Sequence, residues 1–256
     1  MFLRLRQLCL VAHDLDSVVQ DLQAVFDVSV SRRNPGLARF GVENAVLPFA
    51  TSFIEVIAPI RDGTSAGRYL ERRQGDGGYM VILDSEDLER WRRHVESIGV
   101  RIAEELANDD YWDLQFHPRD TGGALLEINR SRNGERLDGG YGPAGPDWKS
   151  YMKTGTVKGV LSAELQSDDP VRLARRWSEI LRSPAEEVDG RLRITLDTGC
   201  LEFVMAGDGR GEGLSAVEVE VADPEVVLER AGRRGLQTDG DAVIVGGVRF
   251  DLVTGA

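Results

Sequence analysis

The pattern of apolar and polar positions repeats four times along the chain. In each repeat an aliphatic run ends at an aspartate and a helical pattern begins, as in LCLVAHDLDSVV, MVILDSEDLERW, LSAELQSDDPVRL and AVEVEVADPEVVL. Aspartate suits the position before a helix, because its carboxylate accepts the unpaired backbone N–H groups of the first turn. Asp169 and Asp223 are each followed by a proline, which has no N–H that would need an acceptor there. The repeat predicts four strand-then-helix modules.

Each predicted helix carries an apolar stripe about one face wide, which indicates that it packs on a sheet. The stripes are Leu15, Val18, Val19, Leu22, Val25 and Phe26; Leu88, Trp91, Val95 and Ile98; Leu173, Ala174, Trp177, Ile180 and Leu181; and Val227, Leu228 and Ala231. After each helix the pattern changes to period two, as in FIEVIAP, ALLEIN, CLEFVMAG and VRFDLV. One helix among several strands predicts an α+β fold.

The length of 256 residues suits two domains of about 125 residues each. Residues 131–157 are rich in glycine, proline and polar residues, which marks a domain boundary. We therefore expect a first domain at residues 1–130, a linker at 131–157 and a second domain at 158–256. Trp148 and Tyr151 predict that the linker packs on its surroundings while it runs over the surface.

Composition narrows the classes of partner. A net charge of -12 argues against nucleic acid or an anionic membrane surface. No apolar run is long enough to span a membrane, and the first residues lack the pattern of a secretory signal. The two cysteines, Cys9 and Cys200, are typical of free thiols in a reducing compartment. We expect a cytoplasmic monomer or homodimer that binds a small molecule.

Two glutamates on predicted strands are the best candidates for chemistry. Glu55 shares a strand face with Phe53 and Ile57, and Glu127 shares one with Leu125, because side chains alternate across a strand. A carboxylate on an apolar face is costly unless it is paired, protonated or bound to a cation. The alternative is that these strand faces are exposed to solvent and that the glutamates only aid solubility. His117, just before a strand, is a further candidate for the pocket.

Two stretches carry a resemblance to a known superfamily. FGVENAVLPFATSFIEVIAP resembles the third-to-fourth-strand region of glyoxalase-like domains, and QFHPRDTGGALLEI resembles the closing hairpin of methylmalonyl-CoA-epimerase-like members. The first 130 residues thus resemble the vicinal-oxygen-chelate superfamily, which also includes bleomycin-resistance proteins; the second half does so only through its repeated modules. The resemblance implies four βαβββ modules that pair into two glyoxalase-like incomplete barrels.

The resemblance also implies metal ligands on the first and last strand of each module. These positions hold Gln7, Glu55, Met80 and Glu127. Met80 stands where a histidine is expected, and its thioether suits copper(I) better than hard divalent ions. We expect at most a weak divalent metal on Gln7, Glu55 and Glu127, or else an organic ligand lying against Met80, Phe53 and His117. The corresponding Ser162, Glu202, Ala216 and Asp251 predict no metal in the second domain.

Two functions remain open at this point. The first is an enzyme of lyase or isomerase type, with or without a metal, in which Glu55 or Glu127 moves a proton next to a carbonyl. Two carboxylates in one cleft would raise one pKa toward neutrality. The second is a metal-free protein of the bleomycin-resistance type that binds a small molecule. An extradiol dioxygenase is disfavoured, because neither half offers the two histidines and carboxylate that iron requires there.

Overall fold

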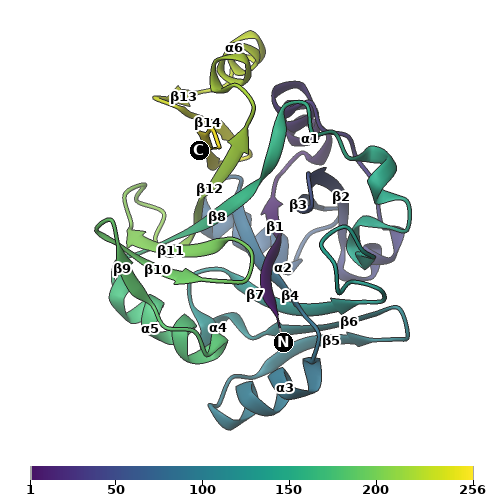
Figure 1. Ribbon diagram of the computed structural model, residues 1–256, viewed down its shortest axis with the longest axis vertical. Helices are drawn as coiled ribbons and strands as arrows, with labels where there is room; N and C mark the ends of the chain where they lie inside the picture. The colour runs from purple at the N-terminus through teal and green to yellow at the C-terminus, as the bar shows by residue number, and fades with distance from the viewer. Residues whose placement is uncertain (1, 256) are drawn as a thin grey trace. The chain divides into compact units, whose positions relative to one another are not determined.

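The computed structural model describes residues 2–255 and shows an α+β fold of four successive modules (Figure 1). The first holds β1 (Leu3–Val11), α1 (Leu15–Phe26), η1 (Pro35–Phe40), β2 (Val42–Phe49), β3 (Ser52–Pro59) and α2 (Ser65–Arg73). The second holds β4 (Gly77–Ser85), α3 (Leu88–Ser97), β5 (Ile102–Ala107), β6 (Tyr111–Phe116), α4 (Pro118–Thr121) and β7 (Leu125–Ser131).

The second half repeats this order after two short helical turns, η2 (Gly142–Ala144) and η3 (Trp148–Tyr151). The third module holds β8 (Val157–Ser167), α5 (Pro170–Leu181), β9 (Glu186–Val188), β10 (Arg191–Thr195) and β11 (Cys200–Met205). The fourth holds β12 (Gly213–Val221), α6 (Pro224–Arg234), β13 (Thr238–Asp239), β14 (Ala242–Val245) and β15 (Val248–Val253).

The aspartates at the four junctions cap the helices as predicted. The carboxylates of Asp14, Asp87, Asp169 and Asp223 each accept a hydrogen bond from a backbone N–H in the first turn of α1, α3, α5 and α6. Most of the predicted stripe residues are buried, and Gly235 ends α6 in the left-handed conformation that favours glycine. The local signals in the sequence therefore locate these helices correctly.

Three modules share the predicted βαβββ order, and in each the first strand runs parallel to the last. The parallel pairs are β4 with β7, β8 with β11, and β12 with β15. The first module departs from the pattern, because a single bridge between Arg32 and Val46 stands where a strand is expected. There Asn34 accepts from Gly36 N, and Pro35 starts the helical turn η1, so the chain curls instead of extending.

The chain forms two compact units. Unit 1 contains the residues up to Gln7, Tyr79–Gly142 and Ser162–Ser215. Unit 2 contains Leu8–Gly78, Pro143–Leu161 and the residues from Ala216 on. Unit 1 thus combines most of the second and third modules, whereas unit 2 combines most of the first and fourth. The division into sequence halves at 131–157 stays a prediction.

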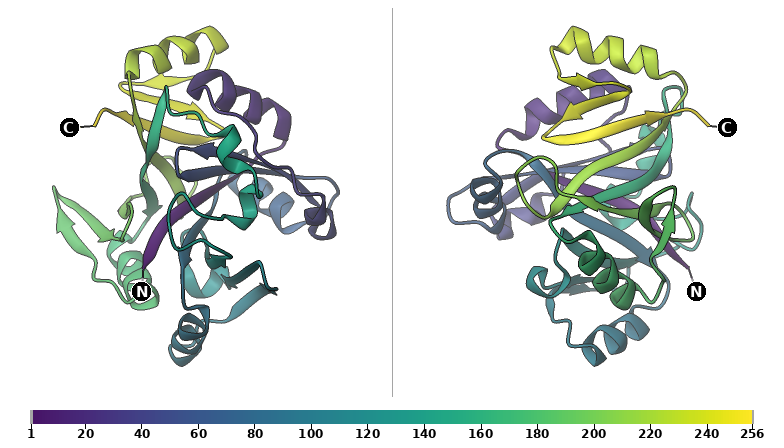
Figure 2. Two further views of the ribbon diagram at one scale, coloured as in Figure 1. Left: turned by 45° about the vertical axis from the view of Figure 1, so that its right-hand side comes forward. Right: turned by 90° about the vertical axis from the view of Figure 1, so that its left-hand side faces the viewer.

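Each unit has its own apolar core. In unit 2, α1 lies beside α6 (Figure 2), and Phe26 lies 5.2 Å in ring centroid distance from both Phe49 and Phe250. In unit 1, α3 packs on β6 and β7, while Trp177 of α5 packs on Phe203 with ring centroids 6.0 Å apart.

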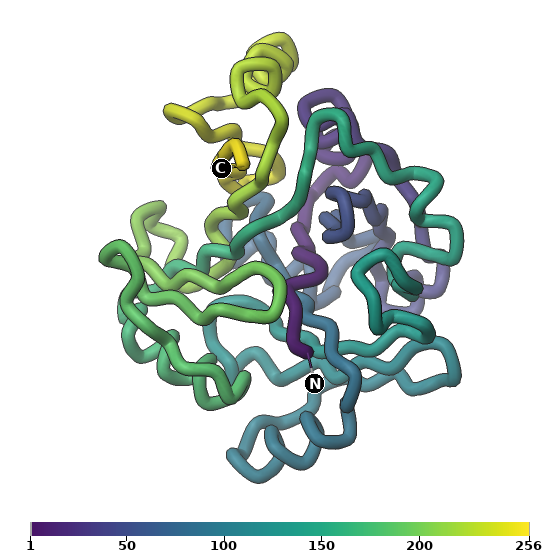
Figure 3. The backbone as a smooth tube through the Cα atoms, viewed as in Figure 1, coloured from purple at the N-terminus to yellow at the C-terminus, as the bar shows by residue number. Residues whose placement is uncertain are grey.

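The irregular segment between residues 131 and 157 can be followed in teal in Figure 3. Trp148 is buried and packs edge-on against Phe53 at a centroid distance of 5.1 Å, both in unit 2. The predicted packing of the linker through Trp148 is therefore confirmed. Among residues 2–255, no helix has the length and apolar character needed to cross a membrane.

Candidate functional site

One face of the second-module sheet collects polar side chains. The register sets Ile82 opposite Glu127 and Asp84 opposite Asn129 on β4 and β7. On β6, Tyr111, Asp113 and Gln115 lie opposite Ser131, Asn129 and Glu127. Residues opposite one another in a sheet share a face, so these side chains all point to the same side. The apolar α3 covers the other face, which leaves this polar face as the candidate site.

Glu127 lies at the centre of that face and is almost fully buried. Its Oε1 accepts a hydrogen bond of 2.8 Å from the Tyr111 hydroxyl and one of 3.0 Å from Asn129 Nδ2. Both donors are neutral. Burial and the nearby carboxylates raise the pKa of Tyr111 well above its ordinary value, so this hydroxyl keeps its proton. The Oε1 atom of Glu127 is thus held by two neutral hydrogen-bond donors.

Asp113 is the second carboxylate of this cluster. Burial, followed by repulsion from Glu127, raises the pKa of Asp113 to about 7, although a hydrogen bond from Leu106 N opposes the shift. A carboxyl group with this pKa exchanges its proton near neutral pH. Asp113 and Glu127 are thus two buried carboxyl groups on one face, close enough for the charge of Glu127 to act on Asp113. This pair is the clearest acid–base element of unit 1.

The structure brings together only some of the residues predicted from the sequence. Gln7, Met80 and Glu127 are buried in unit 1, and Met80 shares the face of Glu127 because its register partner is Leu125. Glu55 is buried in unit 2, where Asn44 Nδ2 donates to its Oε1 at 2.6 Å. The convergence of Gln7 and Glu55 with Met80 and Glu127 therefore stays a prediction.

Two predicted pocket residues have structural contacts. Phe53 packs on Trp148, as described above. His117 precedes α4, and its Nδ1 accepts from Arg119 N at 3.2 Å and lies 3.3 Å from Arg101 Nη2. These contacts place His117 at the start of a short helix, at the far end of β6 from Tyr111.

Sequence reasoning missed Tyr111, Asp113 and Asn129. The stretch YWDLQF alternates Tyr111, Asp113 and Gln115 with larger apolar residues, which is the period-two signal of a strand with one polar face. That signal was available. What it could not supply was the register with β7, which sets these side chains beside Glu127.

The donor set of this face fits a divalent metal poorly. Oε1 of Glu127 already accepts two hydrogen bonds, and Met80 offers only a soft thioether. Within residues 2–255, no three or more His, Cys, Asp or Glu side chains are grouped so that they could hold an ion.

The third module, also in unit 1, has a polar sheet face that corresponds to the face of Glu127, but arginines surround its carboxylates. Glu202 lies opposite Glu164, two residues beyond the pair of Cys200 and Ser162, so it corresponds to Glu127 in register. Arg191 Nη1 donates to Glu164 Oε2 at 3.1 Å and to Glu202 Oε2 at 2.8 Å. Arg193 Nη2 donates to Glu202 Oε1 at 2.5 Å. The buried carboxylates here are neutralised by arginines.

The fourth module, in unit 2, has no buried carboxylate at the position that matches Glu127. Asp251 lies opposite Glu218 at the position that matches Glu127, but it is partly exposed and forms an ion pair of 3.1 Å with Arg249. Ala216, at the position matching Met80, is buried and apolar.

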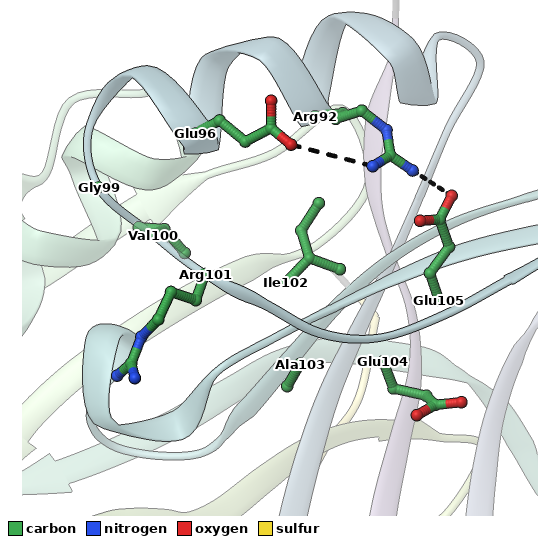
Figure 4. A pocket seen from close by; sticks show the side chains of 9 residues that line it. All are labelled: Arg92, Glu96, Gly99, Val100, Arg101, Ile102, Ala103, Glu104 and Glu105. Carbon is green, nitrogen blue, oxygen red and sulfur yellow. Dashed lines mark hydrogen bonds and ion pairs between the residues drawn. The ribbon is translucent and has the colours of Figure 1, made fainter.

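A surface hollow of about 650 Å³ lies between α3 and β5 (Figure 4). It is lined by Arg92, Glu96, Gly99, Val100, Arg101, Ile102, Ala103, Glu104 and Glu105. Arg92 pairs with Glu96 and Glu105 across one end, and Arg101 is held by Asp120. The hollow borders the edge strand β5, which β6 separates from β7 and Glu127.

Comparison with known proteins gives the same fold. Residues 8–128 match the family described as the glyoxalase-like domain. A hypothetical protein from Staphylococcus aureus superposes with a TM-score of 0.70 at 12% identity, over 99% of this chain and 100% of its own. A search of curated proteins found no match.

Methylmalonyl-CoA epimerases superpose on half of the chain. The enzyme from Mycobacterium tuberculosis has a TM-score of 0.45 at 22% identity, and the alignment covers 50% of this chain and 88% of its own. The Streptomyces coelicolor enzyme in complex with 2-nitronate-propionyl-CoA has the same TM-score of 0.45 and 22% identity, over 51% of this chain and 99% of its own.

Proposed function

From the premise that this chain is a vicinal-oxygen-chelate protein with a glyoxalase-like domain over residues 8–128, we propose that it is a small-molecule enzyme of isomerase or lyase type. In this proposal it moves a proton at a carbon next to a carbonyl and needs no metal. The observation that carries the proposal is the pair of buried carboxyl groups, Asp113 and Glu127, on one sheet face, with the pKa of Asp113 raised to about 7. A general acid or base works best with a pKa near the working pH.

The surroundings of the pair suit this chemistry. The ionised member of the pair removes the proton, and the protonated member returns one to the substrate. The Tyr111 hydroxyl and the Asn129 amide hold Glu127 in place at 2.8 and 3.0 Å. Glu55, with Asn44 as its donor, is a second candidate base in unit 2, as the sequence predicts. No step requires a metal ion.

Exchange of carbon-bound hydrogen tests the proposal without a known substrate. The protein is treated with a chelator and incubated in D₂O with acyl thioesters and 2-oxo acids, and loss of the proton next to each carbonyl is followed by NMR. We expect exchange for at least one class, with a rate that falls at least about tenfold in Asp113→Asn. Glu96→Gln is the matched control, because Glu96 lies on α3, which covers the other face of this sheet, and its side chain is 57% exposed.

Exchange that appears only after a divalent metal is added would overturn the metal-free reaction. Equal rates in Asp113→Asn and wild type would overturn the role of the pair.

A second candidate function is metal-free binding of a small molecule. The deep burial of both carboxylates favours it, since Glu127 is 4% and Asp113 6% exposed. Such a protein would bind members of the same panel and exchange none of their protons. The exchange experiment therefore separates the two functions.

A further inference from the structure

Strand β5 is an open edge of the second-module sheet. In the part of the chain that the structure describes, it pairs only with β6, in antiparallel register. Asn108 N donates to Tyr111 O at 2.9 Å, and in an antiparallel pair every second residue turns its backbone toward the partner strand. The backbone of Leu106 therefore faces β6, whereas Glu105 and Ala107 direct their N–H and C=O groups away from the sheet. Such an edge can accept a further strand.

The surface hollow of about 650 Å³ lies beside this edge, between β5 and α3. Figure 4 shows Ile102 and Glu105 pointing toward α3, and Glu104 pointing away from it. Val100 is buried and Ile102 is half-buried, so the lining of the hollow is partly apolar. A segment added to β5 would carry side chains on alternate sides, so that every second one would point toward the hollow.

The two arginines of the hollow already have carboxylate partners. Arg92 Nη2 donates to Glu105 Oε1, which also accepts from Trp112 Nε1 at 2.9 Å. Arg101 donates to both carboxylate oxygens of Asp120, each at 2.8 Å. The hollow therefore offers little positive charge to an anion.

Two carboxylates at this edge can accept further donors. Glu104 is exposed and forms no hydrogen bond or ion pair within residues 2–255. Glu96 is 57% exposed, and its ion pair with Arg92 is long, at 3.9 Å. Glu96 lies on the α3 side of β5, and Glu104 points to the other side (Figure 4). Two consecutive basic residues of an added strand would therefore reach one carboxylate each, the first with its aliphatic stem along Ile102.

A second copy of the same edge fits poorly. Two antiparallel β5 strands would bring the glutamates of one copy close to those of the other, and like charges opposite one another are destabilising. The register of β5 with β6 also shifts between Ile102 and Glu104, and such a bulge interrupts regular pairing at that end. Charges and bulges are means by which edge strands avoid pairing with themselves. The edge thus favours a segment of opposite charge.

We propose that the edge of β5 over residues 104–107, together with the hollow beside it, is a docking site for an extended basic segment of a partner protein. The segment adds a strand to the sheet through hydrogen bonds with the outward backbone groups of Glu105 and Ala107. One basic side chain enters the hollow, and a neighbouring one meets Glu104. The inference goes beyond the proposed proton transfer and does not depend on it.

The probe is the synthetic peptide acetyl-Thr-Val-Lys-Lys-Val-Thr-amide, and the same peptide with Glu-Glu in place of Lys-Lys is the charge control. Binding to the full chain is followed by NMR of the backbone amides. The basic peptide should shift the amide signals of Glu105 and Ala107 in a saturable way, and the acidic peptide should not. Glu104→Lys should weaken binding at least about tenfold. Glu187→Gln should change it less than about twofold, because Glu187 is also an exposed glutamate but lies on β9, the outer strand of the third module.

The backbone pairing is tested without a change of charge. Ala107→Pro removes an outward N–H, and proline is tolerated on edge strands, so the fold should persist while binding weakens at least about tenfold. Two copies of the basic peptide, each N-methylated at one of the two sets of alternate residues, test the same point on wild type if Ala107→Pro fails to fold. One copy should bind at least about tenfold more weakly than the other, because only one set donates to β5.

Three results would overturn the proposal. They are equal binding of the acidic peptide, equal binding of the two N-methylated copies, and dimerisation of the chain that Ala107→Pro abolishes. The last result would show that the occupant of this edge is a second copy.

Discussion

Glu127 and Glu202 hold the same register position in the second and third modules, and both are buried in unit 1. Their partners differ in charge. Glu127 accepts from a neutral tyrosine and a neutral amide, with Asp113 nearby. Glu202 accepts from Arg191 and Arg193.

The difference decides what each carboxylate can do. A carboxylate held by two guanidinium groups has its charge compensated and its oxygens occupied by hydrogen bonds. A carboxylate held by neutral donors raises the pKa of a second acid beside it, as Glu127 does for Asp113. One backbone position thus gives a structural anion in one module and a candidate base in the other, and the choice depends on residues of neighbouring strands.

The largest expected effect concerns catalysis. Glu127→Gln should lower proton exchange at the carbon next to the carbonyl by about 100-fold, the usual contribution of a general base. Glu202→Gln should change the rate less than about twofold, since Arg191 and Arg193 already occupy the carboxylate oxygens of Glu202 and leave them unavailable to a substrate. The exchange rates of the two variants, measured on chelator-treated protein, check this. A similar loss in both would mean that the two modules are functionally equivalent.

The next effect is the pH dependence of stability. The pKa of Asp113 is about 7 in the folded protein and near 4 when unfolded, so the folded state binds the extra proton between those values. The contribution of Asp113 to stability should therefore be fully present below pH 4 and fall as the pH rises to 7, by at most about 1.4 kcal/mol per pH unit.

Urea unfolding of wild type and Asp113→Asn between pH 4 and 7 measures this slope. Asp113→Asn should be flatter by the contribution of this one group. Glu202→Asp, which keeps the arginine-paired charge, should retain the wild-type slope. If Asp113→Asn has the same slope as wild type, another group causes the pH dependence.

The sequence predicted the parts of this comparison that depend on local signals. The aspartate caps and the period-two strands located the modules, and the resemblance to the superfamily placed Glu202 and Asp251 in the positions that match Glu127. It did not predict Asp113 and Tyr111 as neighbours of Glu127, because β6 and β7 meet only through their register. Nor did it predict that most of the second and third modules would share a compact unit, since an apolar stripe does not specify its partner.

A smaller effect should come from the arginines of the third module. Arg193→Gln removes two hydrogen bonds to Glu202, at 2.5 and 3.1 Å, and leaves that buried carboxylate with less compensation. Because the Arg193 side chain is 29% exposed, water offsets part of the loss, and we expect a cost of about 1–2 kcal/mol in the free energy of unfolding. Arg132→Gln, in an exposed pair with Asp110, should cost less than about 0.5 kcal/mol. A larger cost for Arg132→Gln than for Arg193→Gln would show that side-chain exposure does not determine which ion pair contributes more to the free energy of unfolding.

The smallest effect compares neutral donors on the two faces. Tyr111→Phe removes the hydroxyl that donates to Glu127, and Ser215→Ala removes one that donates to Glu164 at 3.0 Å. Glu164 also has Arg191, so Ser215→Ala should cost no more than about 0.5 kcal/mol. The Oε1 atom of Glu127 accepts from the neutral donors Tyr111 and Asn129, so Tyr111→Phe should cost about 1 kcal/mol or more and should also raise the pKa of Glu127. The stability difference is measured by urea unfolding and the pKa shift by carboxyl NMR. A merely structural hydroxyl would change stability without changing the pKa of Glu127. An unchanged pKa of Glu127 in Tyr111→Phe would therefore show that Tyr111 does not influence this carboxylate. The contrast between the two faces would then depend on Asp113 alone.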